Sequence, residues 1–158
     1  MSLLPFFQTI ENTAMGHAIR DSQWLFPIIE AMHLLGLSVI GGVVLIVNMR
    51  LLGLGLRNHP AGQLERDARP FFNASLILML VSGFLLFSSE AVKCYYNQAY
   101  WFKMICLLLA ITFTLTVQRR VAAADGHGGG SLTGKLVAIV SLLLWTGVGV
   151  GGRWIGFS

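Results

Sequence analysis

Three ionisable residues lie inside long apolar runs of the sequence. Glu30 and His33 fall in the first run and Lys103 in the third, while Glu90 ends the second. A charged group inside a bilayer costs about 2.5 to 3.5 kcal/mol on insertion scales, so each of these residues needs a physical reason. Because imidazole and deprotonated amine nitrogens bind metals, His33 and Lys103 form a candidate ligand pair.

The spacing along the expected helices brings these two groups to a similar depth. His33 lies about 13 Å below Trp24 at 1.5 Å per helical residue, and Lys103 lies about one turn below Tyr100. The long lysine stem extends the reach of its amine. Both groups are therefore expected in the outer half of the membrane, where they can face one cavity.

A haem b would explain this cluster. Haem in a membrane bundle takes axial ligands from facing helices and needs small residues where the flat ring enters. His33 is the first expected ligand, with Gly36 one turn below it, and either Lys103 or His17 is the second. The residues expected to tune the site by charge, or to pair with haem propionates, are Glu30, Glu90, Lys93 and Arg153.

Two other interpretations of the cluster stay open. In the first, Glu30, His33 and Lys103 form a polar network that only holds helices together in a subunit without a cofactor. In the second, copper binds to residues whose spacing is not compact: His17, Met32, His33 and Cys94. A di-iron site is excluded, because the Glu-x-x-His motif that such sites use twice occurs once here.

Composition requires a membrane around these residues. The chain of 158 residues is 55% hydrophobic and 11% charged, whereas a soluble domain carries about 25% charged residues. A spanning helix needs about 20 mostly apolar residues. The sequence therefore predicts a single all-α membrane domain, residues 1–158, folded as a transmembrane four-helix bundle. Its spans are expected at about 24–52, 71–89, 100–117 and 136–152.

The segments outside the spans have their own signals. Residues 1–21 are too polar to span and predict an amphipathic helix on the outer membrane surface, with one face formed by Phe7, Ile10, Ala14 and His17. Pro60 and Pro70 are expected to stop helices in the first polar connection. His59 and His127 are expected to be solvated loop residues.

Charge predicts the orientation. The first and third connections hold most of the basic residues: Arg50, Arg57, Arg66, Arg69, Arg119, Arg120 and Lys135. By the positive-inside rule these connections are cytoplasmic, and both termini lie outside a bacterial inner membrane. The net charge is +4, but the basic residues form no stripe, so no nucleic-acid partner is expected.

Two stretches resemble the HemJ-type protoporphyrinogen oxidases. AMHLLGLSVIGGVVLIVNMRLLG is similar to their first helix, which carries a histidine, a midway glycine and an arginine, here His33, Gly41 or Gly42, and Arg50. YWFKMICLLLAITF is similar to their third helix, in which an aromatic pair precedes a lysine, here Lys103. The chain is similar, more distantly, to the copper-resistance D membrane domain. WLFPIIEAMHLLG also resembles a bacterial family of small membrane proteins without assigned function.

The resemblance implies a small helical membrane protein that binds haem b through His33 and Lys103. Together with the residues, it predicts electron transfer or oxidation of a small quinone- or porphyrin-like substrate. The alternative is a non-catalytic membrane subunit without a cofactor. The expected partners are the lipid bilayer and a quinone or a membrane redox protein, and glycines in the first and last spans allow a homo-oligomer.

Overall fold

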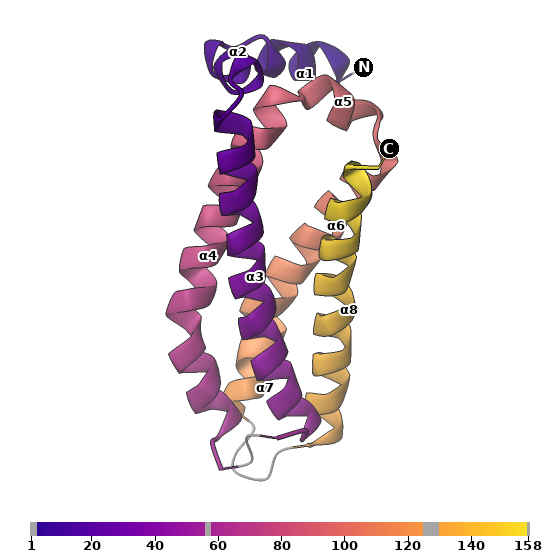
Figure 1. Ribbon diagram of the computed structural model, residues 1–158. Helices are drawn as coiled ribbons and strands as arrows, with labels where there is room; N and C mark the ends of the chain where they lie inside the picture. Colours follow the sequence, from indigo (N-terminus) through magenta and orange to yellow (C-terminus); the bar gives the residue numbers. More distant parts are fainter. Residues whose placement is uncertain (1–2, 56–57, 125–129, 158) are drawn as a thin grey trace.

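The protein is a four-helix bundle whose upper end is covered by short helices (Figure 1). The computed structural model describes residues 3–55, 58–124 and 130–157, and all regular structure in these ranges is helical. The long elements are α3 (Leu25–Leu52), α4 (Ala61–Ser89), α6 (Gln98–Phe113) with its continuation, and α8 (Leu132–Ile155). The continuation of α6 is a π-helical segment, η1 (Thr114–Gln118), followed by α7 (Arg119–Ala124).

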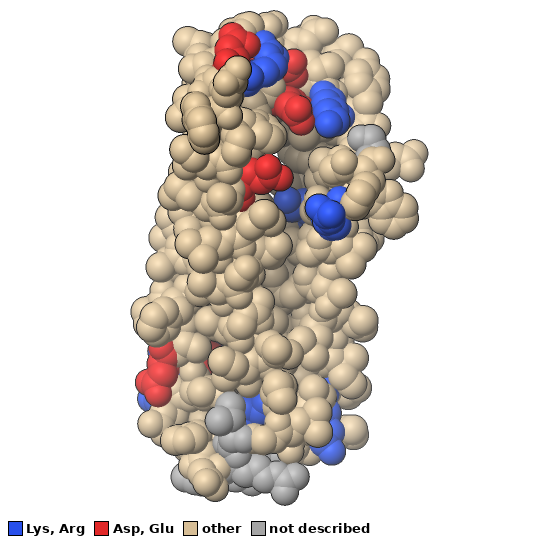
Figure 2. Space-filling view, in the orientation of Figure 1, with Lys and Arg blue, Asp and Glu red and all other residues tan. Residues whose placement is uncertain are grey.

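Four helices are long and apolar enough to cross a membrane: Leu25–Leu52, Ala61–Ser89, Gln98–Ala124 and Leu132–Ile155. Large apolar side chains such as Ile77, Leu108 and Leu143 point outward and are more than 60% exposed. Figure 2 shows that charged side chains gather toward the two ends of this face and leave an uncharged band between them. Such an apolar surface is stable in contact with lipid, so the chain is a multi-pass membrane protein.

The second span begins earlier than expected. α4 starts at Ala61 and not near residue 71, and Pro70 lies inside the helix, so its prediction as a helix stop was wrong. Proline removes one backbone hydrogen bond, but tertiary contacts can outweigh that loss. Here the turn around Pro70 is supported by Glu65, which accepts hydrogen bonds from Arg69 and forms an ion pair with Arg119 on α7 at 3.2 Å.

The third and fourth spans extend beyond their predicted limits at both ends. Asn97 caps α6, because its side-chain oxygen accepts from the backbone N–H of Ala99 at 2.9 Å. Ser131 caps α8 in the same way by accepting from Gly134 N–H at 3.0 Å. A span predicted from hydropathy ends at the last apolar residue, whereas a capped polar turn continues the helix. The expected ranges 100–117 and 136–152 were therefore too short.

The N-terminal segment forms two surface helices and not one. α1 (Leu4–Glu11) and α2 (Ala14–Asp21) are separated at Thr13, whose side chain accepts from Gly16 N–H at 3.2 Å and caps α2. They lie across the upper end of the bundle, beside α5 (Ala91–Tyr96) (Figure 1). Phe7 is buried among the rings of Phe87, Tyr95 and Trp101. The helices are therefore held by protein contacts at the end of the bundle.

The apolar core fills the middle and lower parts of the bundle. Its main cluster consists of Ile40, Val44, Phe72, Leu76, Met79, Leu107, Ala110, Trp145 and Val148. On α6, the first buried apolar residue among those described is Leu107, and on α3 it is Ile40. The inward-facing residues above this level include His33, Ser82 and Lys103. The core therefore ends below the residues that carry the candidate chemistry.

Candidate functional site

His33 lies at the contact between α3 and α4. Its Nδ1 is 3.0 Å from the hydroxyl oxygen of Ser82, and the ring lies against Gly83. A Cβ added to Gly83 would be 3.1 Å from the imidazole Cε1, so a larger residue would press on the ring. Glycine at this position thus allows the imidazole of a partly buried histidine to sit flat against the neighbouring helix.

The hydrogen bonds around Ser82 determine which nitrogen of His33 carries the proton. A serine hydroxyl has one proton, and that of Ser82 is donated to the Leu78 carbonyl at 2.6 Å. Ser82 therefore accepts the bond from His33, and the ring proton is on Nδ1. Among the described residues, Nε2 then has no hydrogen-bond partner, which is the arrangement found in metal-binding histidines whose other nitrogen is held by a neighbouring group.

Lys103 comes from α6 and runs along two glycines of α8. A Cβ on Gly151 would be 3.1 Å from Lys103 Cβ, and one on Gly152 would be 3.5 Å from the Nζ atom. Within the described ranges, the lysine amine makes no hydrogen bond or ion pair.

There is open space on the same helix. Gly149, one turn before Gly152, is only partly exposed, yet no atom lies within 4 Å of the place its Cβ would take. Figure 2 shows a hollow in the upper half of this face, with acidic side chains on one side and basic side chains on the other.

The remaining predicted residues lie around this centre in different ways. Glu30 is exposed, and no partner for its carboxylate is found in the part of the chain that the structure describes. Glu90 joins α4 to α5 and lies 3.6 Å from Lys93 Nζ. The Arg153 guanidinium lies 4.7 Å from the centre of the Phe157 ring near the end of α8. These charged residues therefore border the upper end of the bundle.

Gly36 does not lie where a haem ring was expected to enter. A Cβ at this position would be 3.2 Å from Met79 Cγ and 3.3 Å from the Ser75 carbonyl oxygen. Both atoms belong to α4, so Gly36 serves the close approach of α3 and α4. On α8, the place of an added Cβ is open at Gly149, whereas at Gly152 the Lys103 side chain lies 3.5 Å from it.

His17 lies on the exposed face of α2. Its Nδ1 is 2.8 Å from the Arg20 guanidinium, which also pairs with Glu11 at 3.0 Å. Since arginine can only donate, Nδ1 must be the acceptor, and the neutral ring carries its proton on Nε2. Neither nitrogen of His17 is then free for a metal in this arrangement.

Cys94 on α5 holds its proton firmly. Burial raises the pKa of its thiol to about 11, with the nearby Glu90 carboxylate adding to the effect. A protonated thiol is a poor metal ligand, because the thiolate is the binding form. Residues 3–55, 58–124 and 130–157 also contain no group of three His, Cys, Asp or Glu side chains suited to a metal ion.

Several polar residues that sequence analysis did not single out are buried. Asn48, Gln118 and Ser141 form a network in which Asn48 donates to Ser141 at 3.1 Å and Ser141 donates to Gln118 at 2.9 Å. It joins α3, η1 and α8 below the main core. Polar residues inside apolar runs were a signal for this network.

Arg50 is fully buried and not a loop charge. Its Nε donates to the backbone carbonyl of His59 at 2.7 Å, which draws the first connection onto the end of the bundle. The His59 side chain is exposed, as expected, while His127 lies outside the described residues. Glu65, also expected in a loop, is buried on α4.

Together, these features define a small multi-pass membrane protein with a polar, titratable centre above its apolar core. The chain belongs to DUF6644, a family of unknown function, whose model matches residues 6–158. Comparison with curated proteins and with solved structures gave no match. The match includes the surface helices as well as the four spans. A relationship to HemJ-type or copper-resistance D proteins stays a prediction.

Proposed function

We propose that the protein binds haem b and serves in electron transfer or in oxidation of a small quinone- or porphyrin-like substrate. The observation that carries the proposal is the free Nε2 lone pair of His33, oriented by Ser82 on the neighbouring helix. A hydrogen bond to the other ring nitrogen fixes the orientation and the proton position of a metal-binding histidine. Bound haem would supply one-electron chemistry.

The second ligand in this proposal is Lys103. Among the described residues its amine has no hydrogen bond or ion pair, and it lies beside Gly152. It would bind through Nζ after losing its proton, whereas His17 is engaged with Arg20. Glu30, Glu90 and Arg153 would set the charge around the site.

The proposed location is a bacterial inner membrane, with both termini outside. The two termini lie toward the same end of the bundle (Figure 1), and the opposite end carries the basic residues Arg66, Arg69, Arg119, Arg120 and Lys135. Placing that end in the cytoplasm satisfies the positive-inside rule. The site would then face the outer leaflet, within reach of a lipid-soluble partner.

The alternative is a non-catalytic membrane subunit without a cofactor. The observation that favours it is the same His33–Ser82 contact, since a hydrogen bond between α3 and α4 can serve as structural glue alone. The buried network of Asn48, Gln118 and Ser141 is an example of such glue in this chain.

A visible difference spectrum separates the two functions. The full chain is purified in detergent after expression with ample haem supply, and the dithionite-reduced spectrum is compared with the oxidised one. A Soret band and a sharp α-band are expected, both lost in His33→Ala. His59→Ala is the matched control, since among the described residues this exposed histidine makes its contact through the backbone carbonyl. A colourless wild-type protein would overturn the haem proposal.

The same spectra identify the second ligand. Lys103→Ala is expected to retain haem but to change its spin state, because one of the two nitrogen groups that would hold it is lost. His17→Ala is expected to leave the spectrum unchanged. The reverse pattern would assign the position to His17.

A further inference from the structure

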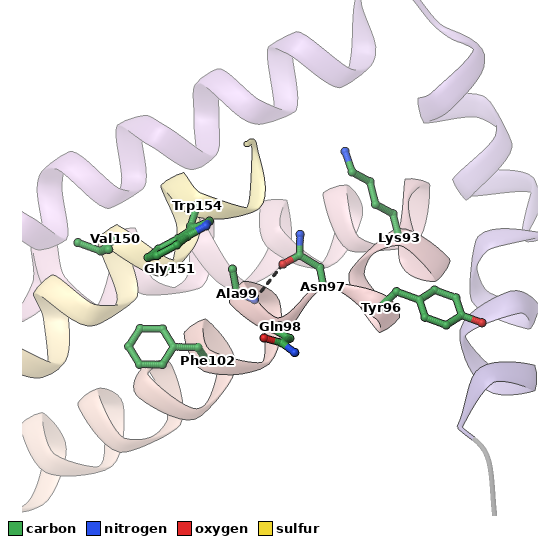
Figure 3. A pocket seen from close by; sticks show the side chains of 9 residues that line it. All are labelled: Lys93, Tyr96, Asn97, Gln98, Ala99, Phe102, Val150, Gly151 and Trp154. Atoms are coloured by element: carbon green, nitrogen blue, oxygen red, sulfur yellow. Dashed lines mark hydrogen bonds between the residues drawn. The ribbon is translucent and has the colours of Figure 1, made fainter. Parts of the chain in front are cut away.

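A cavity of about 750 Å³ lies between α5, α6 and the end of α8 (Figure 3). Its walls are formed by Lys93, Tyr96, Asn97, Gln98, Ala99, Phe102, Val150, Gly151 and Trp154. Neither candidate haem ligand is among these residues. Its volume falls within the range of about 300 to 1,000 Å³ that is usual for small-molecule sites.

The lining is divided into an apolar and a polar part. Figure 3 shows Phe102, Val150 and Trp154 toward one end and Lys93, Asn97 and Gln98 toward the other. Val150 lies one turn further inside its helix than Trp154, whereas Lys93 belongs to the short helix outside the spans. The polar end therefore lies at the outer end of the bundle, and the apolar end points toward the middle of the apolar band.

This division selects the chemistry of an occupant. Aromatic rings favour a flat ring that can stack on them, and the Gln98 amide can donate to a carbonyl oxygen. Lys93 is the cation in the lining, and it already lies 3.6 Å from the Glu90 carboxylate. A phosphate headgroup is bound by clustered cations, so the lining favours an uncharged head.

We infer that this cavity binds the ring of a quinone, with the isoprenoid tail lying over the outer faces of α6 and α8 in the lipid. The ring's carbonyl oxygens lie toward Gln98 and its faces toward Phe102 and Trp154. Gly151 belongs both to the cavity wall and to the packing against Lys103, where an added Cβ would be 3.1 Å from Lys103 Cβ. A quinone here would thus be separated from the candidate haem ligand by one layer of packing.

The inference deepens the proposed function, since it names the substrate class and its place. Electron transfer to or from the quinone would depend on haem at His33, whereas binding of the quinone would not. The test therefore measures binding and haem content separately, on the same preparations.

The probe is a short-chain azidobenzoquinone with one isoprenyl unit, photoactivated on the detergent-purified full chain. Adducts are mapped by mass spectrometry. Labelling is expected in residues 93–102 and 150–154, and an excess of the unlabelled quinone should suppress it. Protection by short-chain phosphatidylglycerol but not by the unlabelled quinone would overturn the inference in favour of a lipid site.

Two variants fill or alter the cavity from different helices. Val150→Phe adds bulk at the apolar end and is expected to weaken labelling about tenfold, which corresponds to about 1.4 kcal/mol. Leu143→Phe is its matched control, because Leu143 is an exposed residue on the same outer face of α8, about two turns lower. Gln98→Leu removes the amide donor and should also weaken labelling. It provides the test if Val150→Phe fails to fold.

The outcomes distinguish this inference from the proposed function. Equal labelling of Val150→Phe, Gln98→Leu and Leu143→Phe would overturn the quinone site, whatever the haem content. Specific labelling of a colourless protein would support the quinone site and overturn haem binding. Haem retained by a protein without specific labelling would overturn the quinone site alone.

Discussion

The His33 imidazole and the Ser82 hydroxyl lie 3.0 Å apart and join α3 to α4 just above the apolar core. Since Ser82 donates its hydroxyl proton to the Leu78 carbonyl, it accepts from Nδ1 of His33. Among the described residues, the Nε2 lone pair then has no hydrogen-bond partner. One hydrogen bond therefore connects two spans, and in the proposed function it would also orient a nitrogen ligand. The haem-binding and purely structural functions make different predictions for its removal.

Substitution of Ser82 by alanine is expected to weaken haem binding by about 10- to 100-fold, the usual effect of losing the group that orients a ligating histidine. The measurement is the transfer of haem from the purified protein to an apoprotein acceptor. Ser38→Ala is the control, because that hydroxyl is on the exposed side of α3 and bonds to its own helix at Leu34. If both variants hold haem equally, Ser82 does not orient a ligand.

Asn48→Ala is expected to lower the free energy of unfolding by about 1 to 3 kcal/mol, because it leaves buried groups of Gln118 and Ser141 without their partner. The measurement is unfolding in mixed micelles with increasing denaturing detergent. The double variant Asn48→Ala/Ser141→Ala should lose less than the sum of the single losses, since the residues share one network. Additive losses would contradict that coupling.

Gly16→Ala is expected to loosen α2 from α4. A Cβ at Gly16 would be 2.5 Å from the Ser88 carbonyl oxygen and 2.6 Å from that of Glu11, and both atoms belong to the backbone. Faster trypsin cleavage after Arg20 would report the loosening. Gly41→Ala is the matched control, because no atom lies within 4 Å of its added Cβ. That change should be neutral or stabilise the helix by about 0.5 to 1 kcal/mol. Equal cleavage rates would show that α2 does not need this close approach.

Cys94 provides a test that depends on pH. Its pKa rises from 9.0 to about 11, so the folded chain holds the thiol proton more tightly than the unfolded chain. The resulting contribution to stability is fully present below about pH 9 and is lost as pH rises through about 11. Alkylation by iodoacetamide, measured in a Cys106→Ser background, should therefore be slow at pH 8 and accelerate above pH 10. Reaction at pH 8 as fast as in the detergent-unfolded chain would contradict the raised pKa.

The sequence by itself determined the class of the fold and the level of the candidate centre. Apolar runs of this length must be helical in lipid, because each backbone polar group needs a partner within its own segment. Because ionisable groups are costly in a bilayer, the sequence also indicated His33 and Lys103 as candidate functional residues. Both arguments depend only on local composition, which is why they could be made without a structure.

Only the tertiary structure decided how these residues are held. The partner of His33 is Ser82, 49 positions along the chain, and Lys103 packs beside glycines of α8, whereas Gly36 packs against α4. Contacts between helices also override local signals. α4 continues through Pro70, and the guanidinium of Arg50 is drawn into the end of the bundle. Such contacts join residues far apart in the sequence, and their energies depend on how the helices pack.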